Sequence, residues 1–112
     1  LGIPLAFDAV GHRDPHLQQA ILRKPSGQAV GAAALASSKG AWLDMNLSEL
    51  PDEAYTCTVI LADGTTRVVG RLPAGSGWWG GRIPVDPSKV VAIRVLEPDG
   101  SVFAEGRMPL AS

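Results

Sequence analysis

Hydrophobic residues from Leu17 onward fall in short runs, and turn-forming residues interrupt these runs regularly. The interruptions come about every 8–12 residues, a spacing typical of an all-β sandwich or barrel. They are PSG at 25–27, SKG at 38–40, LPD at 50–52, DG at 63–64, GSG at 75–77, DP at 86–87 and PDG at 98–100. We expect Asp63 and Gly64 to form a type I′ hairpin turn, because both residue types tolerate the positive φ that this turn requires.

Within the runs, apolar and polar side chains alternate with a period of two, which predicts strands with one face on a core and one in water. In the run 41–50, for example, Leu43, Met45 and Leu47 share the apolar face. The run 28–36 contains five alanines, which favour a helix by propensity, but its length and flanking turns favour a strand. We therefore expect about eight strands, at 17–24, 28–36, 41–50, 54–62, 66–72, 78–85, 89–97 and 101–108.

A strand, a turn glycine, a second strand and a second glycine recur three times along the chain. The turn glycines are Gly27, Gly64 and Gly100, and the second glycines are Gly31, Gly70 and Gly106. The spacings between these elements differ from one copy to the next, so the pattern does not indicate a solenoid repeat. We interpret it as a hairpin that recurs within one sandwich.

The composition is that of one globular domain, with 112 residues of which 46% are apolar. We predict an N-terminal arm or linker at 1–16 and one all-β domain at 17–112, an immunoglobulin-like β-sandwich. The 10 Lys and Arg residues nearly balance the 11 Asp and Glu residues, giving a net charge of −1. This balance argues against a nucleic-acid binder, which needs a basic surface. No apolar run approaches the roughly 20 residues of a membrane-spanning helix.

The predicted arm contains the chain's two histidines, which are the first candidates for a metal site. His12 and His16 would need Asp8 and Asp14 as further ligands to reach the three or four protein ligands of a zinc site. Pro15 disfavours the helix that would bring the two imidazoles to one face, because a proline pushes the preceding residue out of the α region. We therefore expect no metal site.

A catalytic nucleophile is not expected either. The single cysteine, Cys57, falls on the apolar face of its strand, where a free thiol behaves as a small buried hydrophobe. No histidine flanks it to generate a thiolate. Ser76 lies in a Gly-Ser-Gly loop that lacks the spacing of a nucleophile elbow. We expect a protein without enzymatic activity and without a cofactor.

The segment 75–82 is the most unusual cluster, because it places two tryptophans in a glycine-rich loop. Adjacent strand residues point to opposite faces, so Trp78 and Trp79 cannot share a surface. Trp79 is separated from the apolar positions 83 and 85 by an even number of residues, so all three should point to the same face of a strand. This alternation predicts Trp79 inside and Trp78 outside, beside Arg82. The outer side chain could simply shield a loop, or it could form a partner-binding patch, which Trp42 joins if the two strands are neighbours.

Seven segments share a layout with one known family: GQAVG (27–31), AWLDM (41–45), LPDEAYTC (50–57), LADGTTRVVG (61–70), GWWG (77–80), VD (85–86) and VLEPDGS (95–101). Together, over roughly residues 17–108, they resemble the extracytoplasmic C-terminal domain of actinobacterial membrane-anchored anti-sigma factors, similar in plan to the anti-sigma-K type. The resemblance depends on the turn glycines, the Leu-Pro-Asp-x-x-Tyr segment and the tryptophan pair. It includes no catalytic motif.

In such anti-sigma factors an N-terminal cytoplasmic domain holds a sigma factor, one transmembrane helix follows, and a β-sandwich lies outside the membrane. The resemblance implies a non-enzymatic extracytoplasmic sensor or interaction domain, tethered through a helix upstream of Leu1. It would regulate transcription by controlling the proteolytic release of the cytoplasmic part. Its expected partner outside the membrane is a protein or a glycan. The alternative is a secreted carbohydrate- or protein-binding adhesion module that uses Trp42, Trp78 or Trp79.

Overall fold

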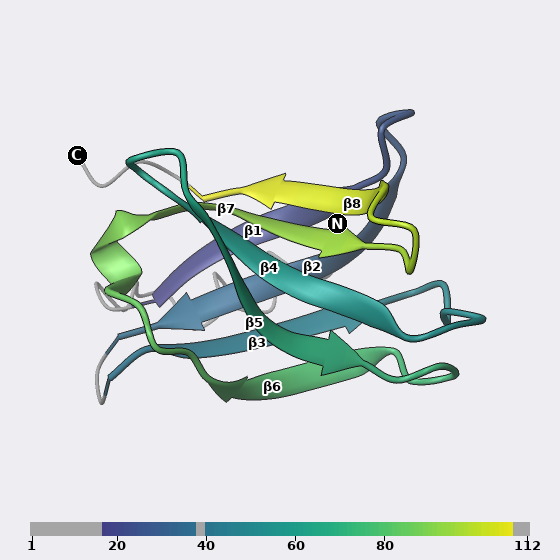
Figure 1. Ribbon diagram of the computed structural model, residues 1–112, viewed down its shortest axis with the longest axis horizontal. Coiled ribbons are helices and arrows are strands. Elements are labelled where there is room, and N and C mark those ends of the chain that lie inside the picture. The colour runs from purple at the N-terminus through teal and green to yellow at the C-terminus, as the bar shows by residue number, and fades with distance from the viewer. Residues whose placement is uncertain (1–16, 38–39, 109–112) are drawn as a thin grey trace, which may run out of the picture.

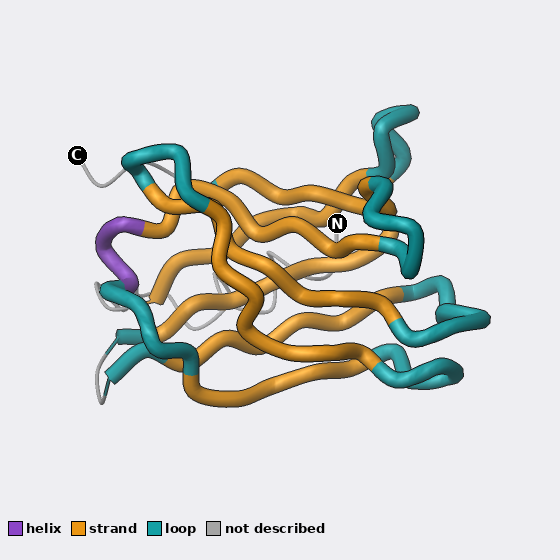
Figure 2. Tube along the Cα trace, in the orientation of Figure 1, coloured by secondary structure: helices purple, strands orange, loops and turns teal. Residues whose placement is uncertain are grey.

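The computed structural model describes residues 17–37 and 40–108, which fold as an all-β domain. Eight strands and one short 3-10 turn, η1, make up this part of the chain (Figures 1 and 2). The strands are β1 (Leu17–Arg23), β2 (Ala29–Ala36), β3 (Trp42–Leu47), β4 (Tyr55–Leu61), β5 (Thr66–Leu72), β6 (Trp78–Arg82), β7 (Val90–Leu96) and β8 (Val102–Arg107), and η1 is Pro87–Lys89. The eight predicted strands are confirmed, including the alanine-rich one. The predicted arm at 1–16, with Asp8, His12, Asp14 and His16, lies outside the described residues.

All eight strands join one antiparallel sheet in the order β5-β4-β7-β8-β1-β2-β3-β6. The sheet curls on itself, so that β4, β5 and β7 cross in front of β1, β2 and β3 (Figure 1). The two edge strands, β5 and β6, come into contact, and the sheet is nearly closed. The immunoglobulin-like detail of the prediction is therefore not confirmed, because the strands form one continuous curled sheet. Along residues 17–37 and 40–108 no helix has the length and apolar character of a membrane span.

The core fills the inside of the curled sheet and comes from the inward positions of the strands. Leu43 and Met45 of β3 have no exposed surface, and Leu47 is also buried, as the alternation predicts. Each fully buried aliphatic side chain of this kind stabilises the fold by about 1.5–3 kcal/mol. The largest other side chains with less than 2% of their surface exposed are Leu22, Val30, Leu35, Cys57, Thr58, Val59, Leu72, Ile93 and Val95.

The middle of β4 is buried on both faces of the sheet. Cys57 points into the core, as predicted, with its Sγ atom 3.6 Å from the Sδ atom of Met45. Its neighbour Thr58 points to the opposite face of the strand, where the alternation of apolar and polar residues predicts solvent, but it is also fully buried. This burial is tolerated because the Thr58 hydroxyl donates a hydrogen bond of 2.8 Å to the backbone carbonyl of Arg94.

The three recurring hairpins are β1–β2, β4–β5 and β7–β8, and they share one type of loop. Gly27, Gly64 and Gly100 have φ angles of 96°, 88° and 90°. Each donates its N–H to the carbonyl three residues earlier, at 2.8, 2.8 and 2.9 Å respectively. No described residue other than glycine has a positive φ, so Asp63 and Gly64 do not form the expected type I′ turn. A three-residue loop with glycine in the left-handed region forms instead, because it requires a positive φ at only one position.

Aspartate side chains close two of these loops and the turn before β7. Asp63, Asp86 and Asp99 each accept hydrogen bonds from the backbone N–H and the hydroxyl of the Thr or Ser two residues later. These bonds, the hydroxyl first, lower the pKa of each carboxyl from its ordinary value of 3.8. The turn residues thus stabilise their loops through the ionised form of the aspartate.

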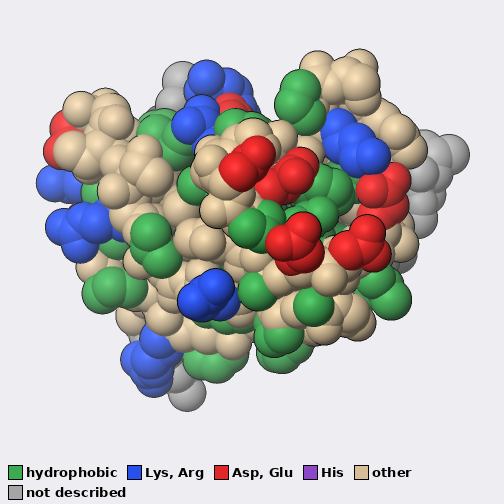
Figure 3. Space-filling view, turned by 45° about the vertical axis from the view of Figure 1, so that its right-hand side comes forward, with side chains coloured by type: hydrophobic (Ala, Val, Ile, Leu, Met, Phe, Trp, Pro, Cys, Tyr) green, Lys and Arg blue, Asp and Glu red, His purple; other side chains and the backbone are tan. Residues whose placement is uncertain are grey.

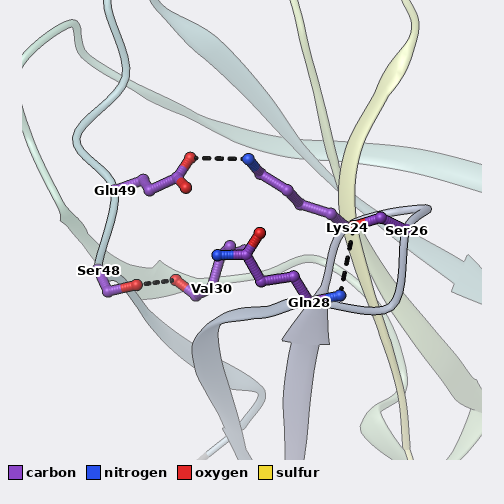
Figure 4. A network of polar contacts seen from close by, with 6 residues as sticks. All are labelled: Lys24, Ser26, Gln28, Val30, Ser48 and Glu49. Carbon is purple, nitrogen blue, oxygen red and sulfur yellow. Dashed lines mark hydrogen bonds and ion pairs between the residues drawn. The ribbon is translucent and has the colours of Figure 1, made fainter.

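A polar network joins the β1–β2 hairpin to the segment after β3 (Figure 4). The Nζ atom of Lys24 lies 3.1 Å from Oε1 of Glu49. The hydroxyl of Ser48 donates a hydrogen bond of 3.0 Å to the carbonyl of Val30. A partly exposed ion pair of this kind contributes no more than about 1 kcal/mol, so it adds little to the stability of the fold.

Candidate binding face

Four neighbouring strands, β1, β2, β3 and β6, pair in register and expose a common outer face. Three rows of residues cross this face: Leu17, Ala36, Trp42 and Arg82; Gln19, Ala34, Asp44 and Gly80; and Ile21, Ala32, Asn46 and Trp78. We call this set of twelve residues the outer face. It brings Trp42 and Trp78 onto neighbouring strands of the same surface, as the sequence interpretation requires.

A groove of about 460 Å³ runs along the outer face. Its floor is formed by Ala32 and Ala34 of β2, whose short side chains leave space between taller neighbours. Gln19 and Ile21 line one side, and Trp78 lies on the other. The volume falls within the range of about 300–1,000 Å³ that is typical of ligand sites. The run of alanines, which weakens the strand signal in the sequence, is thus what creates the groove.

Trp78 forms an exposed aromatic wall of the groove, with 54% of its surface accessible. Its indole lies over Gly80, on the same face of β6. A methyl group at Gly80 would collide with that indole and with Oδ1 of Asp44. Gly80 therefore allows the Trp78 ring and the Asp44 carboxylate to meet above the sheet.

Trp42 approaches the same carboxylate from the other direction. It is 42% exposed, and its indole N–H donates a hydrogen bond of 3.1 Å to Oδ1 of Asp44. The two exposed indoles of the outer face thus converge on one carboxylate. Asp44 and Asn46 also line the groove, beside Trp78.

Asp44 determines the charge of the groove. Among the described residues that line it, Asp44 is the only charged one. The ion pairs that join described residues are Lys24–Glu49 and Arg94–Glu105, and neither includes Asp44. The groove therefore presents one negative charge without a lysine or arginine counterion from that part of the chain.

Trp79 does not belong to this face, which corrects its place among the predicted partner-binding residues. Its side chain is half-buried and packs against the core. A methyl group at Gly70 of β5 would collide with the Trp79 indole. The ring therefore lies where the two edge strands of the sheet come together. Its role is to fill the space inside the curled sheet between β5 and β6.

Arg82 lies on the outer face, opposite Trp42 in the register of β3 and β6. Its guanidinium extends toward the turn before β3, where a methyl group at Gly40 would be 3.2 Å from the Nη1 atom. Arg82 is not one of the residues that line the groove. Of the four predicted residues, the structure thus places Trp78 in the groove and Trp42 and Arg82 beside it.

The structure also adds residues that the sequence interpretation missed. The alternation in β3 points Asp44 and Asn46 outward, but nothing in the sequence of that strand shows that they lie beside a tryptophan from β6. Gln19 and Ile21 come from a strand far away in the sequence. The only local signal for the groove is the cluster of small residues in β2.

A second surface feature is acidic. Side chains of Asp and Glu gather around hydrophobic ones on one side of the molecule (Figure 3). Partial burial, and then the nearby carboxylates, raise the pKa of Tyr55; these carboxylates belong to Glu97, Asp52, Glu49 and Glu53. None of these residues lines the groove.

In the described part of the chain, no group of three or more His, Cys, Asp or Glu side chains is close enough to hold a metal ion.

Comparison of the chain with protein-family models, with curated proteins and with solved structures finds no match. Its function is therefore inferred from the chemistry of the outer face and from the resemblance in its sequence.

Proposed function

We propose that this is a non-enzymatic domain that binds a partner through the outer face of β1, β2, β3 and β6. The observation that carries the proposal is the groove of about 460 Å³ beside the exposed ring of Trp78. Apolar grooves with a few converging polar groups are the usual form of a binding site. Exposed tryptophans are also enriched among the residues that dominate binding energy.

The sequence resemblance supports a regulatory context for this binding. We infer that the domain is the extracytoplasmic sensor of a membrane-anchored anti-sigma factor. In that arrangement, a cytoplasmic domain and a transmembrane helix would precede Leu1 in the parent protein. Occupancy of the outer face would then control when proteolysis releases the sigma-binding part, and thereby transcription.

A secreted adhesion module that binds a carbohydrate or a protein is the second candidate. The same exposed tryptophans, Trp42 and Trp78, favour it, because an aromatic wall suits either ligand. The parent sequence upstream of Leu1 separates the two candidates. A membrane helix preceded by a small cytoplasmic domain supports the anti-sigma factor, whereas a signal peptide supports the adhesion module.

A reporter assay in cells tests the proposed function directly. Trp78→Ala in the parent protein should change the output of a sigma-factor-dependent reporter, because it removes the wall of the groove. Val68→Ala is the matched control, since Val68 is 66% exposed but lies on β5, outside the outer face. Unchanged output with Trp78→Ala, in a domain that unfolds at the wild-type temperature, would contradict the proposal.

A further inference from the structure

We propose that the groove takes an organic cation, namely the ammonium or guanidinium group of a lysine or arginine side chain on a partner protein. This assignment rests on the proposed function and names the chemistry of its ligand. Three features of the groove carry it: a carboxylate that forms no ion pair with a described lysine or arginine, an exposed indole beside that carboxylate, and an apolar floor.

The charge of the groove selects the sign of the ligand. Asp44 is the only charged residue among the described lining residues, and it takes part in neither ion pair that joins described residues. A cation placed there gains a charge-assisted hydrogen bond, which is roughly twice as strong as a neutral one. An anionic ligand, such as a phosphate group, would instead face a like charge.

The aromatic wall favours the same ligand. Tryptophan provides the best ring face for a cation, at about 6 Å or less from the ring centre. The Trp78 ring and Oδ1 of Asp44 meet above Gly80, so one cation has access to both groups. The hydrogen bond of 3.1 Å from the Trp42 indole holds that carboxylate on the face before any ligand arrives.

The floor of the groove suits the stem of a long basic side chain. Ala32, Ala34 and Ile21 give it an apolar surface, along which the methylene groups of lysine or arginine would lie. Gln19 and Asn46 provide donors and acceptors at its sides. These amides suit the backbone of the peptide that carries the basic side chain.

A titration with matched peptides tests the assignment on the full chain. The probes are N-acetyl-Gly-Lys-Gly-amide and the same peptide with an acetylated lysine, which has the same stem but no charge. We expect the lysine peptide to shift the indole N–H resonance of Trp78 and the amide of Asp44 saturably. The acetylated peptide should leave both resonances in place.

Two substitutions locate the charge that is responsible. Asp44→Asn keeps the shape and the hydrogen-bond acceptor, and it should weaken binding of the lysine peptide about tenfold. Glu53→Gln removes an exposed carboxylate outside the outer face, so it should leave the affinity unchanged. Equal shifts with the acetylated peptide would overturn the assignment, and because that titration uses the wild-type protein, misfolding of a variant cannot explain the result. Wild-type affinity in Asp44→Asn would overturn it as well.

A neutral sugar separates this assignment from the proposed function. If maltotriose shifts Trp78 saturably and the lysine peptide does not, the cation assignment is wrong while the binding face stands. If the lysine peptide produces no saturable shift at all, the assignment is also wrong. The reporter output of Trp78→Ala then decides the proposed function independently.

Discussion

At the scale of single residues, the direction of a side chain follows from strand parity. The alternation predicts Cys57 and Trp79 inside and Trp78 outside, and the structure confirms all three. Side chains alternate between the two faces without interruption along β6, because the pairing of β6 with β3 contains no bulge. The meeting of Trp78 with Asp44 could not be predicted, because it depends on which strands become neighbours.

Cys57 should be almost inert in the folded protein. Burial raises the pKa of its thiol to about 11, so the reactive thiolate is scarce at neutral pH. We expect very slow reaction with a bulky disulfide reagent in the native state and rapid reaction in urea. Fast labelling of the native protein would mean that β4 has a different register.

The two adjacent tryptophans should differ sharply in their contributions to stability. Trp79→Ala removes a ring that packs against the core, and we expect a loss of about 3 kcal/mol in the free energy of unfolding. Trp78→Ala should cost much less, because 54% of that side chain is exposed. Urea unfolding measures both losses.

Iodide quenching of single-tryptophan variants gives an independent check on this pair. The fluorescence of Trp78 should be quenched strongly and that of Trp79 weakly. The opposite result would place Trp79 on the outer face and remove Trp78 from it.

At the scale of strands and turns, most of the fold can be predicted from the sequence. The turn signals and the alternation place all eight strands, because each depends on local chemistry. The type of the turn at Asp63 could not be predicted, because Asp-Gly suits both the type I′ turn and the three-residue loop. The outcome depends on how many residues the flanking strands leave between them.

The aspartate-closed turns predict a dependence of stability on acid. The folded state lowers the pKa of Asp63, Asp86 and Asp99 from 3.8, so it favours their ionised forms. Their contribution to stability is complete above the unfolded value and is lost as the pH falls through the lowered folded value. Replacing all three by Asn should therefore flatten the decline in the urea midpoint between about pH 5 and pH 2. Parallel declines in the two proteins would contradict this account.

At the scale of the whole molecule, the sequence predicts the fold class but not how the sheet closes. The continuous order of eight strands arises from long-range pairs such as β3 with β6 and β4 with β7. The same long-range pairing creates the outer face, so Trp42, Trp78, Asp44 and the alanine floor come together only in the folded domain. The proposal that this outer face binds a partner is central to the function inferred for the molecule.

A labelling experiment on the parent protein in intact cells tests this claim most directly. Ala34→Cys places a thiol on the floor of the groove, Val68→Cys places one on β5, and the buried Cys57 should not react. A bulky maleimide that does not cross membranes should label both new thiols from outside. Only the label at position 34 should change the output of the sigma-factor-dependent reporter. Equal output with either label, or failure of both thiols to react from outside, would contradict an extracytoplasmic binding face in this groove.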